Sequence, residues 1–213
     1  MYGLGLCLLN GEGIPQDQAA AIDWFQRGAN EGNANCMYGL GLCLLNGEGI
    51  QQDQAAAILW FQRGANEGNT KCMYQLGLCL FNGEGIPQDQ AAANRWFQRG
   101  ANEGNAKCMY QLAVSFMEGV GVEIDSRTGI DWFRRGAEQD DPHCMYGLGF
   151  YLFDGVGIAK DQLHAISLFH QADIPWAWER LADLYESGEV CEINPELAHA
   201  FRARLQAEAA PPQ

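Results

Sequence analysis

Residues 37–72 read MYGLGLCLLNGEGIQQDQAAAILWFQRGANEGNTKC, and residues 1–36 differ from this segment at four positions. The segment returns from residue 73 and, with more changes, from residues 109 and 145. A methionine marks the same phase of every copy, at Met1, Met37, Met73, Met109 and Met145. Self-similarity at a fixed period of 36 residues indicates a repeat protein, in which each copy is one structural unit.

Each copy has the pattern of two helices. The first is predicted over residues 33–45 and ends at Gly47, because glycine is favoured just past a helix C-terminus. The second begins after Asp53, a residue that caps helix N-termini, and Asn69 opens the next copy. The predicted buried stripes are Cys36, Leu40, Cys43 and Leu44 on the first helix, and Ala57, Trp60, Phe61 and Gly64 on the second.

Glycines recur inside the predicted helices, where each costs about 1 kcal/mol relative to alanine. Their constant phase predicts close approach of neighbouring helices. They are Gly41, Gly77 and Gly149 on first helices and Gly28, Gly64, Gly100 and Gly136 on second helices. One helical hairpin cannot bury its apolar face alone, so stacked hairpins should form a continuous core.

The motif Leu-Gly-x4-Asn-Gly-x-Gly-Ile-x2-Asp-x3-Ala-x2-Trp-Phe-x2-Gly-Ala-x2-Gly-Asn, at 40–69 and 76–105, resembles the Sel1-like repeat, a relative of the tetratricopeptide repeat. The resemblance implies an all-α fold, a right-handed α/α superhelix (solenoid) of antiparallel helix pairs. We expect a single repeat domain over 1–213, with repeats at 1–36, 37–72, 73–108, 109–144 and 145–176. A degenerate repeat and a C-terminal capping helix follow at 177–213.

Composition narrows the classes of partner. The chain has 213 residues, 47% of them hydrophobic, and a net charge of −14, so nucleic-acid and membrane partners are not expected. Residues 1–20 lack the basic segment of a signal peptide. Met1 falls inside a repeat, which predicts that the first helix lacks its start and that upstream sequence exists. The compartment is left open, with a weak expectation of the cytoplasm.

Eight cysteines raise the question of disulfides or metal. Cys36 and Cys43 lie seven residues apart, about 10 Å along a helix, whereas a disulfide needs Cα atoms about 4.4–6.8 Å apart. Some secreted Sel1-like proteins pair cysteines eight residues apart, but the corresponding position before Cys36 is Gly28. No Cys-x2-Cys motif occurs. We expect buried, reduced thiols, with disulfides or metal binding as the alternatives.

Other candidate sites are weak. The loops Gly11–Gly13, Gly47–Gly49 and Gly83–Gly85 lack the Gly-Lys-Ser/Thr of a phosphate loop and are interpreted as turns. Their single carboxylates make calcium binding a remote alternative. The four histidines show no metalloprotease spacing and no paired nucleophile. No cofactor, metal or catalytic residue is predicted, and an enzyme is not expected.

A binding face is predicted from the related tetratricopeptide architecture, in which first helices line a concave groove. Five of the seven tyrosines share one phase, and tyrosine is favoured at binding surfaces. An alternative is that these rows simply pack between neighbouring first helices. The predicted groove residues are Tyr38, Leu42, Leu45, Lys71, Tyr74, Gln75, Leu78, Phe81, Lys107, Tyr110, Gln111, Tyr146 and Phe150.

The predicted function is a non-catalytic scaffold or adaptor that binds a protein or peptide. The alternative is an enzyme or enzyme-associated module acting on peptidoglycan or β-lactam substrates, which only the family resemblance suggests. A third hypothesis, an array without a ligand, comes from the near-identity of the first copies. The apolar N-terminal end has no polar cap, so end-to-end self-association is also predicted.

Overall fold

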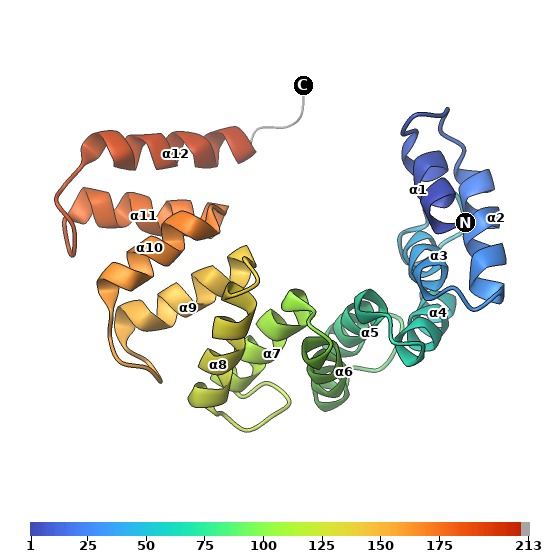
Figure 1. The fold of residues 1–213 in the computed structure, drawn as a ribbon, viewed down its shortest axis with the longest axis horizontal. Coiled ribbons are helices and arrows are strands. Elements are labelled where there is room, and N and C mark those ends of the chain that lie inside the picture. The colour runs from blue at the N-terminus through green and yellow to red at the C-terminus, as the bar shows by residue number, and fades with distance from the viewer. Residues whose placement is uncertain (210–213) are drawn as a thin grey trace. The chain divides into compact units, whose positions relative to one another are not determined.

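The computed structural model describes residues 1–209, which form twelve α-helices arranged in pairs (Figure 1). The pairs repeat about every 36 residues, so the prediction of an all-helical solenoid of Sel1-like repeats is confirmed. The helices are α1 (Tyr2–Asn10), α2 (Gln18–Asn30), α3 (Ala34–Asn46), α4 (Gln54–Asn66), α5 (Thr70–Asn82), α6 (Gln90–Asn102), α7 (Ala106–Glu118), α8 (Ser126–Ala137), α9 (Pro142–Asp154), α10 (Gln162–Ala172), α11 (Pro175–Ser187) and α12 (Pro195–Ala209).

The helix ends follow the predicted capping residues. The Asp53 carboxylate accepts a hydrogen bond from the Ala56 amide at 2.9 Å, and Asn69 does the same for Cys72. Gly47 ends α3 in the left-handed conformation, with φ of 75°. Because the same residues recur in each copy, the pair boundaries repeat along the chain.

The chain divides into two compact units, and the second begins at Met109. In the first unit, each first helix (α1, α3, α5) contacts the second helix of its own pair, and α3 and α5 also contact the second helix of the preceding pair. In the second unit, consecutive helices from α8 to α12 contact one another. No helix within residues 1–209 combines the length and hydropathy needed to cross a membrane.

A row of phenylalanines forms the centre of the core. Each is at most 1% exposed and comes from the second helix of a pair: Phe25, Phe61, Phe97, Phe133 and Phe169. The predicted first-helix stripe is confirmed, since Cys36, Leu40, Cys43 and Leu44 are all buried. The second-helix prediction was wrong at Trp60. That indole is only half-buried, because it lies at the edge of the core under the Arg63 guanidinium, 5.4 Å from the ring centroid.

The glycines inside helices lie where helices approach closely, as predicted. A Cβ built on Gly41 would lie 2.4 Å from the Phe61 ring, and one on Gly64 would lie 2.5 Å from the Cys72 sulfur. Both distances are too short for real contacts, so the space of a side chain is already taken by the neighbouring helix. Each glycine is therefore one half of a packed pair.

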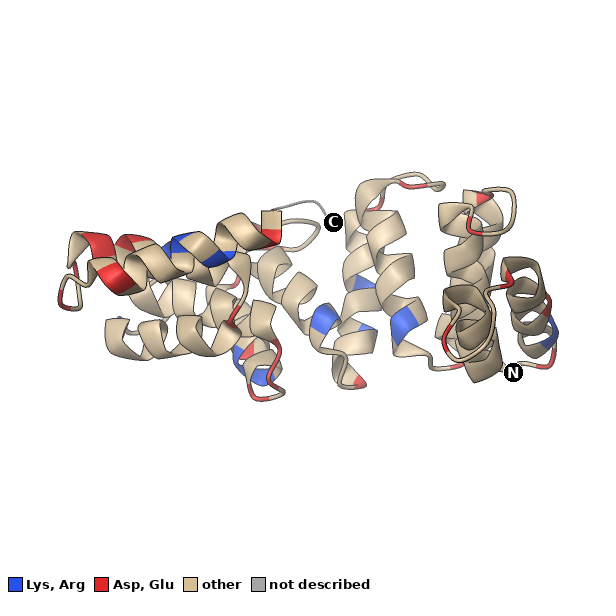
Figure 2. Cartoon of the chain, turned by 90° about the horizontal axis from the view of Figure 1, so that it is seen from above, with Lys and Arg blue, Asp and Glu red and all other residues tan. Residues whose placement is uncertain are grey.

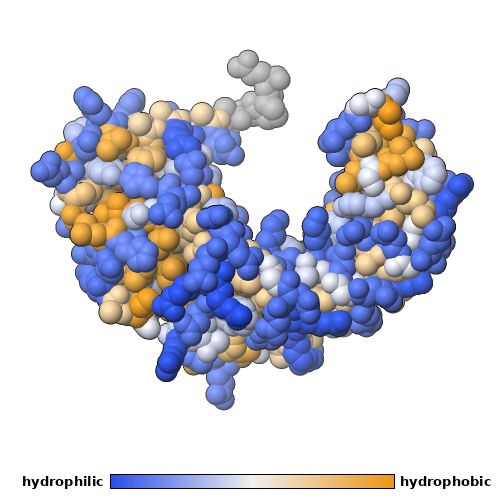
Figure 3. Space-filling view, in the orientation of Figure 1, coloured by the Kyte–Doolittle hydropathy of each residue, from blue (hydrophilic) through white to orange (hydrophobic). Residues whose placement is uncertain are grey.

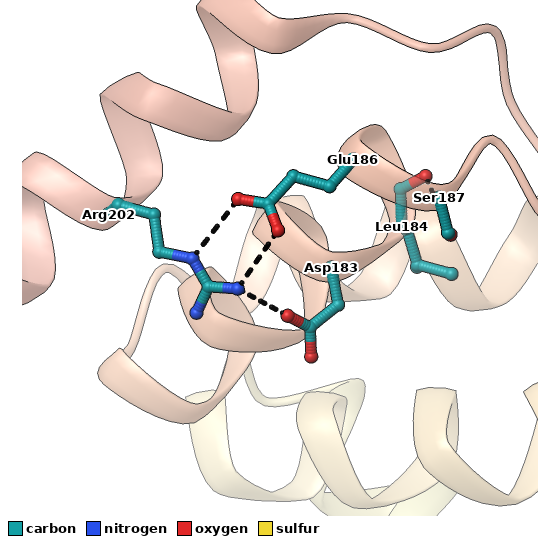
Figure 4. Close-up of polar contacts among 5 residues, drawn as sticks. All are labelled: Asp183, Leu184, Glu186, Ser187 and Arg202. Carbon is teal, nitrogen blue, oxygen red and sulfur yellow. Dashed lines mark hydrogen bonds and ion pairs between the residues drawn. The ribbon is translucent and has the colours of Figure 1, made fainter.

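The C-terminal pair is held by ion pairs on α11 and α12 (Figure 4). The Arg202 guanidinium of α12 binds Asp183 and Glu186 of α11, at 3.3 Å for Glu186. Arg204 of the same helix pairs with Asp173 at 2.8 Å and lies over the Trp178 ring. Helix α12 lies within 177–213, where a capping helix was expected; its role as a cap stays a prediction, and residues 210–213 lie outside the described residues.

The Gly64–Cys72 contact predicts a compensating pair of substitutions. Gly64→Ala should lower the free energy of unfolding by about 1–3 kcal/mol, because the new methyl overlaps the sulfur. Cys72→Ala removes that sulfur, so the double variant should be more stable than the sum of the single variants predicts, by about 1 kcal/mol. Urea unfolding of the four proteins measures this coupling.

Gly3→Ala on α1 is the matched control. A Cβ at Gly3 has nothing within 4 Å, so this helical substitution should be neutral or stabilising. Strictly additive free energies for Gly64→Ala and Cys72→Ala would contradict the proposed contact.

Candidate functional site

The predicted groove residues lie on the first helices of the pairs, with their side chains partly open to solvent. We call this surface the first-helix face and define it by those thirteen residues. Lys71, Lys107 and Phe150 are exposed. The other ten are half-buried: Tyr38, Leu42, Leu45, Tyr74, Gln75, Leu78, Phe81, Tyr110, Gln111 and Tyr146.

Each tyrosine of the row packs one side of its ring on the buried phenylalanine of its own pair. The ring centroids lie 6.4 Å apart for Tyr38 and Phe61, and 5.6 Å apart for Tyr146 and Phe169. The tyrosines therefore contribute to packing against the second helix and remain accessible on the other side. The cited contacts are made with the second helix of the same pair, and binding of a ligand by this tyrosine row stays a prediction.

Phe81 belongs to the predicted groove, but its side chain is turned partly toward the core. Phe81 lies 6.4 Å from Phe97 on the second helix of its pair, and the equivalent Phe153 is only 3% exposed beneath the Arg180 guanidinium. These residues offer less surface to a partner than the tyrosines do.

Lysines of the first-helix face lie over tyrosine rings. Lys71 Nζ is 5.7 Å from the Tyr38 ring centroid, and Lys107 Nζ is 5.9 Å from that of Tyr74. At the next equivalent place, His143 meets Tyr110 edge-on at 5.6 Å. The tyrosine faces of this row thus accept cations from within the chain.

An open pocket of about 200 Å³ lies on the second unit between α7 and α9. Its walls come from Tyr110, Tyr146, Phe150 and Tyr151, with Phe133 of α8 between them and Glu118 at the end of α7. We call it the α7–α9 pocket. Sequence reasoning placed Tyr110, Tyr146 and Phe150 on this face but missed Glu118, Phe133 and Tyr151.

The pocket depends on a local change in the phenylalanine packing. In the other pairs the buried phenylalanine ring lies against a glycine of its own first helix, such as Gly77 for Phe97. In this pair Ala113 stands at the glycine position, and the Phe133 ring lies against Gly147 of α9, where a Cβ would be 2.3 Å away. Phe25 makes the equivalent contact with Gly39 more loosely, at 3.1 Å, and keeps its own glycine, Gly5. Alanine at position 113, where the other copies have glycine, could have indicated from the sequence that the phenylalanine packs differently in this pair.

The eight cysteines are free thiols, and six of them are buried: Cys36, Cys43, Cys72, Cys79, Cys108 and Cys144. Burial raises the pKa of Cys43 and Cys79 to about 11, and that of Cys72 and Cys108 to about 12. Cys7 and Cys191 are only half-buried, so the expectation of eight buried thiols was wrong at these two. Cys7 lies on α1, the first helix of the chain, and Cys191 lies in the loop between α11 and α12.

The loop carboxylates are held within their turns. Glu48 accepts a hydrogen bond from the Asn46 amide at 3.0 Å, and the pairs Asn10–Glu12 and Asn82–Glu84 repeat this contact. Figure 2 shows acidic residues in these connections; within the first-unit helices Asp23 of α2 is acidic and pairs with Arg27 at 2.8 Å. Across residues 1–209, no three His, Cys, Asp or Glu side chains are grouped as metal ligands.

Histidine 170 is the histidine with the best-defined environment. Its Nε2 lies 3.0 Å from the Tyr185 hydroxyl, and partial burial lowers its pKa. His170 lies on α10 and its ring contacts Tyr185 of α11 and Phe201 of α12, which favours a packing role.

The N-terminal helix α1 leaves apolar side chains uncovered, and Figure 3 shows hydrophobic surface over it. Met1 is 46% exposed and Leu4 42%, whereas the equivalent Met37 and Leu40 are at most 1% exposed. Self-association through these apolar side chains stays a prediction.

Paired helices with a fixed repeat, capped turns and an exposed first-helix face define a helical-repeat scaffold. The match to the Sel1 repeat over residues 1–33, 34–69, 70–105, 106–141 and 142–172 shows that the chain belongs to the Sel1 repeat family. No curated protein matches the chain.

Solved structures share the fold. A Sel1 repeat protein from Oxalobacter formigenes is 23% identical, with a TM-score of 0.92 over 97% of this chain and 86% of that one. The protective antigen c5321 of uropathogenic Escherichia coli is 28% identical, with a TM-score of 0.83 over 97% of this chain. The match spans 45% of the antigen chain. The immunity protein Pa5087 of Pseudomonas aeruginosa is 15% identical, with a TM-score of 0.62 over 97% of this chain and 80% of that one.

The burial of the thiols predicts two classes of reactivity in the native protein. At pH 8, Cys7 and Cys191 should react with a thiol reagent quickly, because the half-buried thiol is reached by solvent. The six buried thiols should react only after denaturant is added, since burial suppresses both access and the thiolate. Time-resolved labelling followed by peptide mass spectrometry assigns each rate.

Labelling of Cys72 or Cys108 at the rate of Cys191 in the absence of denaturant would contradict this assignment. Cys191→Ser serves as the control, and should remove one fast-reacting group without changing the other rates.

Proposed function

We propose that this chain is a non-catalytic scaffold that binds a protein or peptide partner along its first-helix face. The observation that carries the proposal is the row of half-exposed tyrosines fixed on a buried phenylalanine row. A tyrosine held by packing has little side-chain entropy left to lose on binding, which favours its use as an anchor. Sel1 repeats also generally mediate protein interactions.

Sequence variation among the copies supports the same face. Between the second and third copies most core residues are retained, the buried Ile58 becoming the buried Asn94, while Gly39 becomes Gln75 on the first-helix face. Between the first and second, Asn35 becomes Lys71. Such changes alter the surface that a partner meets and leave the capping and core residues in place.

A site-specific photocrosslinker tests the location of the partner. Benzoylphenylalanine at Gln75 should crosslink a defined protein, whereas the same probe at Gln62, an exposed position on the second helix α4, should not. Equal crosslinking from both positions would overturn the proposal. Turnover of peptidoglycan or a β-lactam by the purified chain would instead favour the enzymatic alternative.

Replacing a tyrosine of the row should weaken binding of the crosslinked partner. Tyr74→Ala should raise the dissociation constant about 10- to 30-fold, as expected for an interface anchor. Tyr74→Phe keeps the ring on Phe97 and should bind nearly as well as the parent. Calorimetric titration gives the constants, and circular dichroism checks that each variant is folded.

Gln62→Ala is the matched surface control for this series and should leave the dissociation constant unchanged. If Tyr74→Ala binds as tightly as the parent protein, the tyrosine row is not the anchor.

A further inference from the structure

The α7–α9 pocket differs from the equivalent surface between α3 and α5 by a few substitutions. Gly147 stands where α5 has Gln75, and Tyr151 stands where α5 has Cys79. Together with the Phe133 ring lying against Gly147, these changes surround one open space with five aromatic rings. Aromatic faces carry partial negative charge, so such a space favours a cation.

The Glu118 carboxylate lies at the edge of this pocket, at a position where the first three copies have asparagine. In the first three copies an asparagine ends the first helix and donates to a glutamate two residues later, as Asn46 does to Glu48 at 3.0 Å. In the fourth copy Glu118 replaces the asparagine and Val120 replaces the glutamate. Within residues 1–209, Glu118 is in no ion pair or hydrogen bond.

The electrostatic effect of Glu118 reaches the pocket walls. Burial is the main cause that raises the pKa of Tyr110 and of Tyr151, and the negative charge of Glu118 raises both further. A cation bound among these rings would therefore meet an unpaired carboxylate as well as aromatic faces.

The chain does not supply a lysine to this part of the tyrosine row. Lys71 and Lys107 lie over Tyr38 and Tyr74, but the equivalent residue beside Tyr110 is His143. The whole chain has 27 acidic and 13 basic residues, which favours approach of a basic partner. Burial raises the pKa of Tyr146 and the positive charge of Arg180 opposes this, but the Arg180 guanidinium lies over the Phe153 ring, 4.5 Å from its centroid, and does not line the pocket. The lining itself contains no cation, so a guanidinium bound there would come from a partner.

We propose that the α7–α9 pocket binds an arginine side chain of the protein or peptide partner. The guanidinium plane stacks on the tyrosine rings and donates N–H groups to the Glu118 carboxylate. Arginine fits better than lysine because its planar group stacks on aromatic rings, forms paired hydrogen bonds to a carboxylate and is weakly hydrated. This inference rests on the proposed function and names the side chain that the partner presents.

The test uses the full chain and the blocked peptide acetyl-Gly-Ser-Arg-Ser-Gly-amide. Binding is followed by NMR of ¹³C-labelled tyrosine and phenylalanine rings. The arginine peptide should shift the Tyr110 and Tyr151 signals. Replacing arginine by citrulline, a neutral group of nearly the same shape, should weaken binding about tenfold, because a charge-assisted hydrogen bond is lost.

Variants assign the effect to Glu118. Glu118→Gln should bind the arginine peptide about tenfold more weakly and should no longer distinguish it from the citrulline peptide. Glu48→Gln is the matched control, since it removes the same charge from a first-unit loop and should leave binding unchanged. Tyr151→Cys restores the residue of the second and third copies and should also weaken binding.

Several outcomes would overturn the proposal. Equal affinity for the arginine and citrulline peptides, tighter binding of a lysine or trimethyllysine peptide, or the same loss in Glu48→Gln as in Glu118→Gln would each do so. The two proposals fail separately. If a partner crosslinks at Gln75 but binds Glu118→Gln normally, the arginine pocket is wrong and the scaffold function stands. If the arginine peptide binds and no protein crosslinks, the preference of the pocket for arginine stands and the scaffold function is wrong.

Discussion

The contact between a phenylalanine of the second helix and a glycine of the first is the constraint on which the repeat depends. Phe61 and Phe97 are fully buried because Gly41 and Gly77 let the ring approach the helix backbone. A ring so placed fixes the distance between the two helices of a pair. The same ring also contacts the tyrosine of the first-helix face, so the position of that tyrosine depends on the core contact.

A second small–large pair joins successive copies. Gly64 on α4 leaves the space that the Cys72 sulfur of α5 fills, and Gly28 does the same for Cys36. The same contact recurs for Cys108 and Cys144, and sulfur is a polarisable atom of suitable size for an apolar contact. Glycine at this position carries no thiol that could pair with the cysteine, and it leaves room for the sulfur.

Much of the fold could be predicted because the repeat multiplies weak local signals. Asp53, Asn69 and Gly47 are each modest boundary signals, but their recurrence fixes the helix ends. Trp60 was placed wrongly because helical spacing gives the direction of a side chain and not how far the neighbouring helix covers it. Cys191 is half-buried in the loop between α11 and α12, so its position does not follow the helical phase of the other cysteines.

The candidate pocket was predicted only in part, for a related reason. The tyrosine phase identified Tyr110 and Tyr146, since these positions recur. Phe133 and Tyr151 matter through a departure from recurrence: Ala113 fills the site that glycine leaves open elsewhere, and the ring lies against Gly147 of the next copy instead.

In a repeat protein, the residues that match the period specify the scaffold, and the residues that break it mark where one copy differs from the rest. Glu118 belongs to the second kind. In the first three copies the loop glutamate accepts a hydrogen bond from the asparagine at the end of the first helix. In the fourth copy the carboxylate of Glu118 stands at the helix end instead and lines the aromatic pocket. A copy that departs from the others can thus carry the proposed site, because a carboxylate displaced by two residues lies at the pocket while the helices keep their pairing.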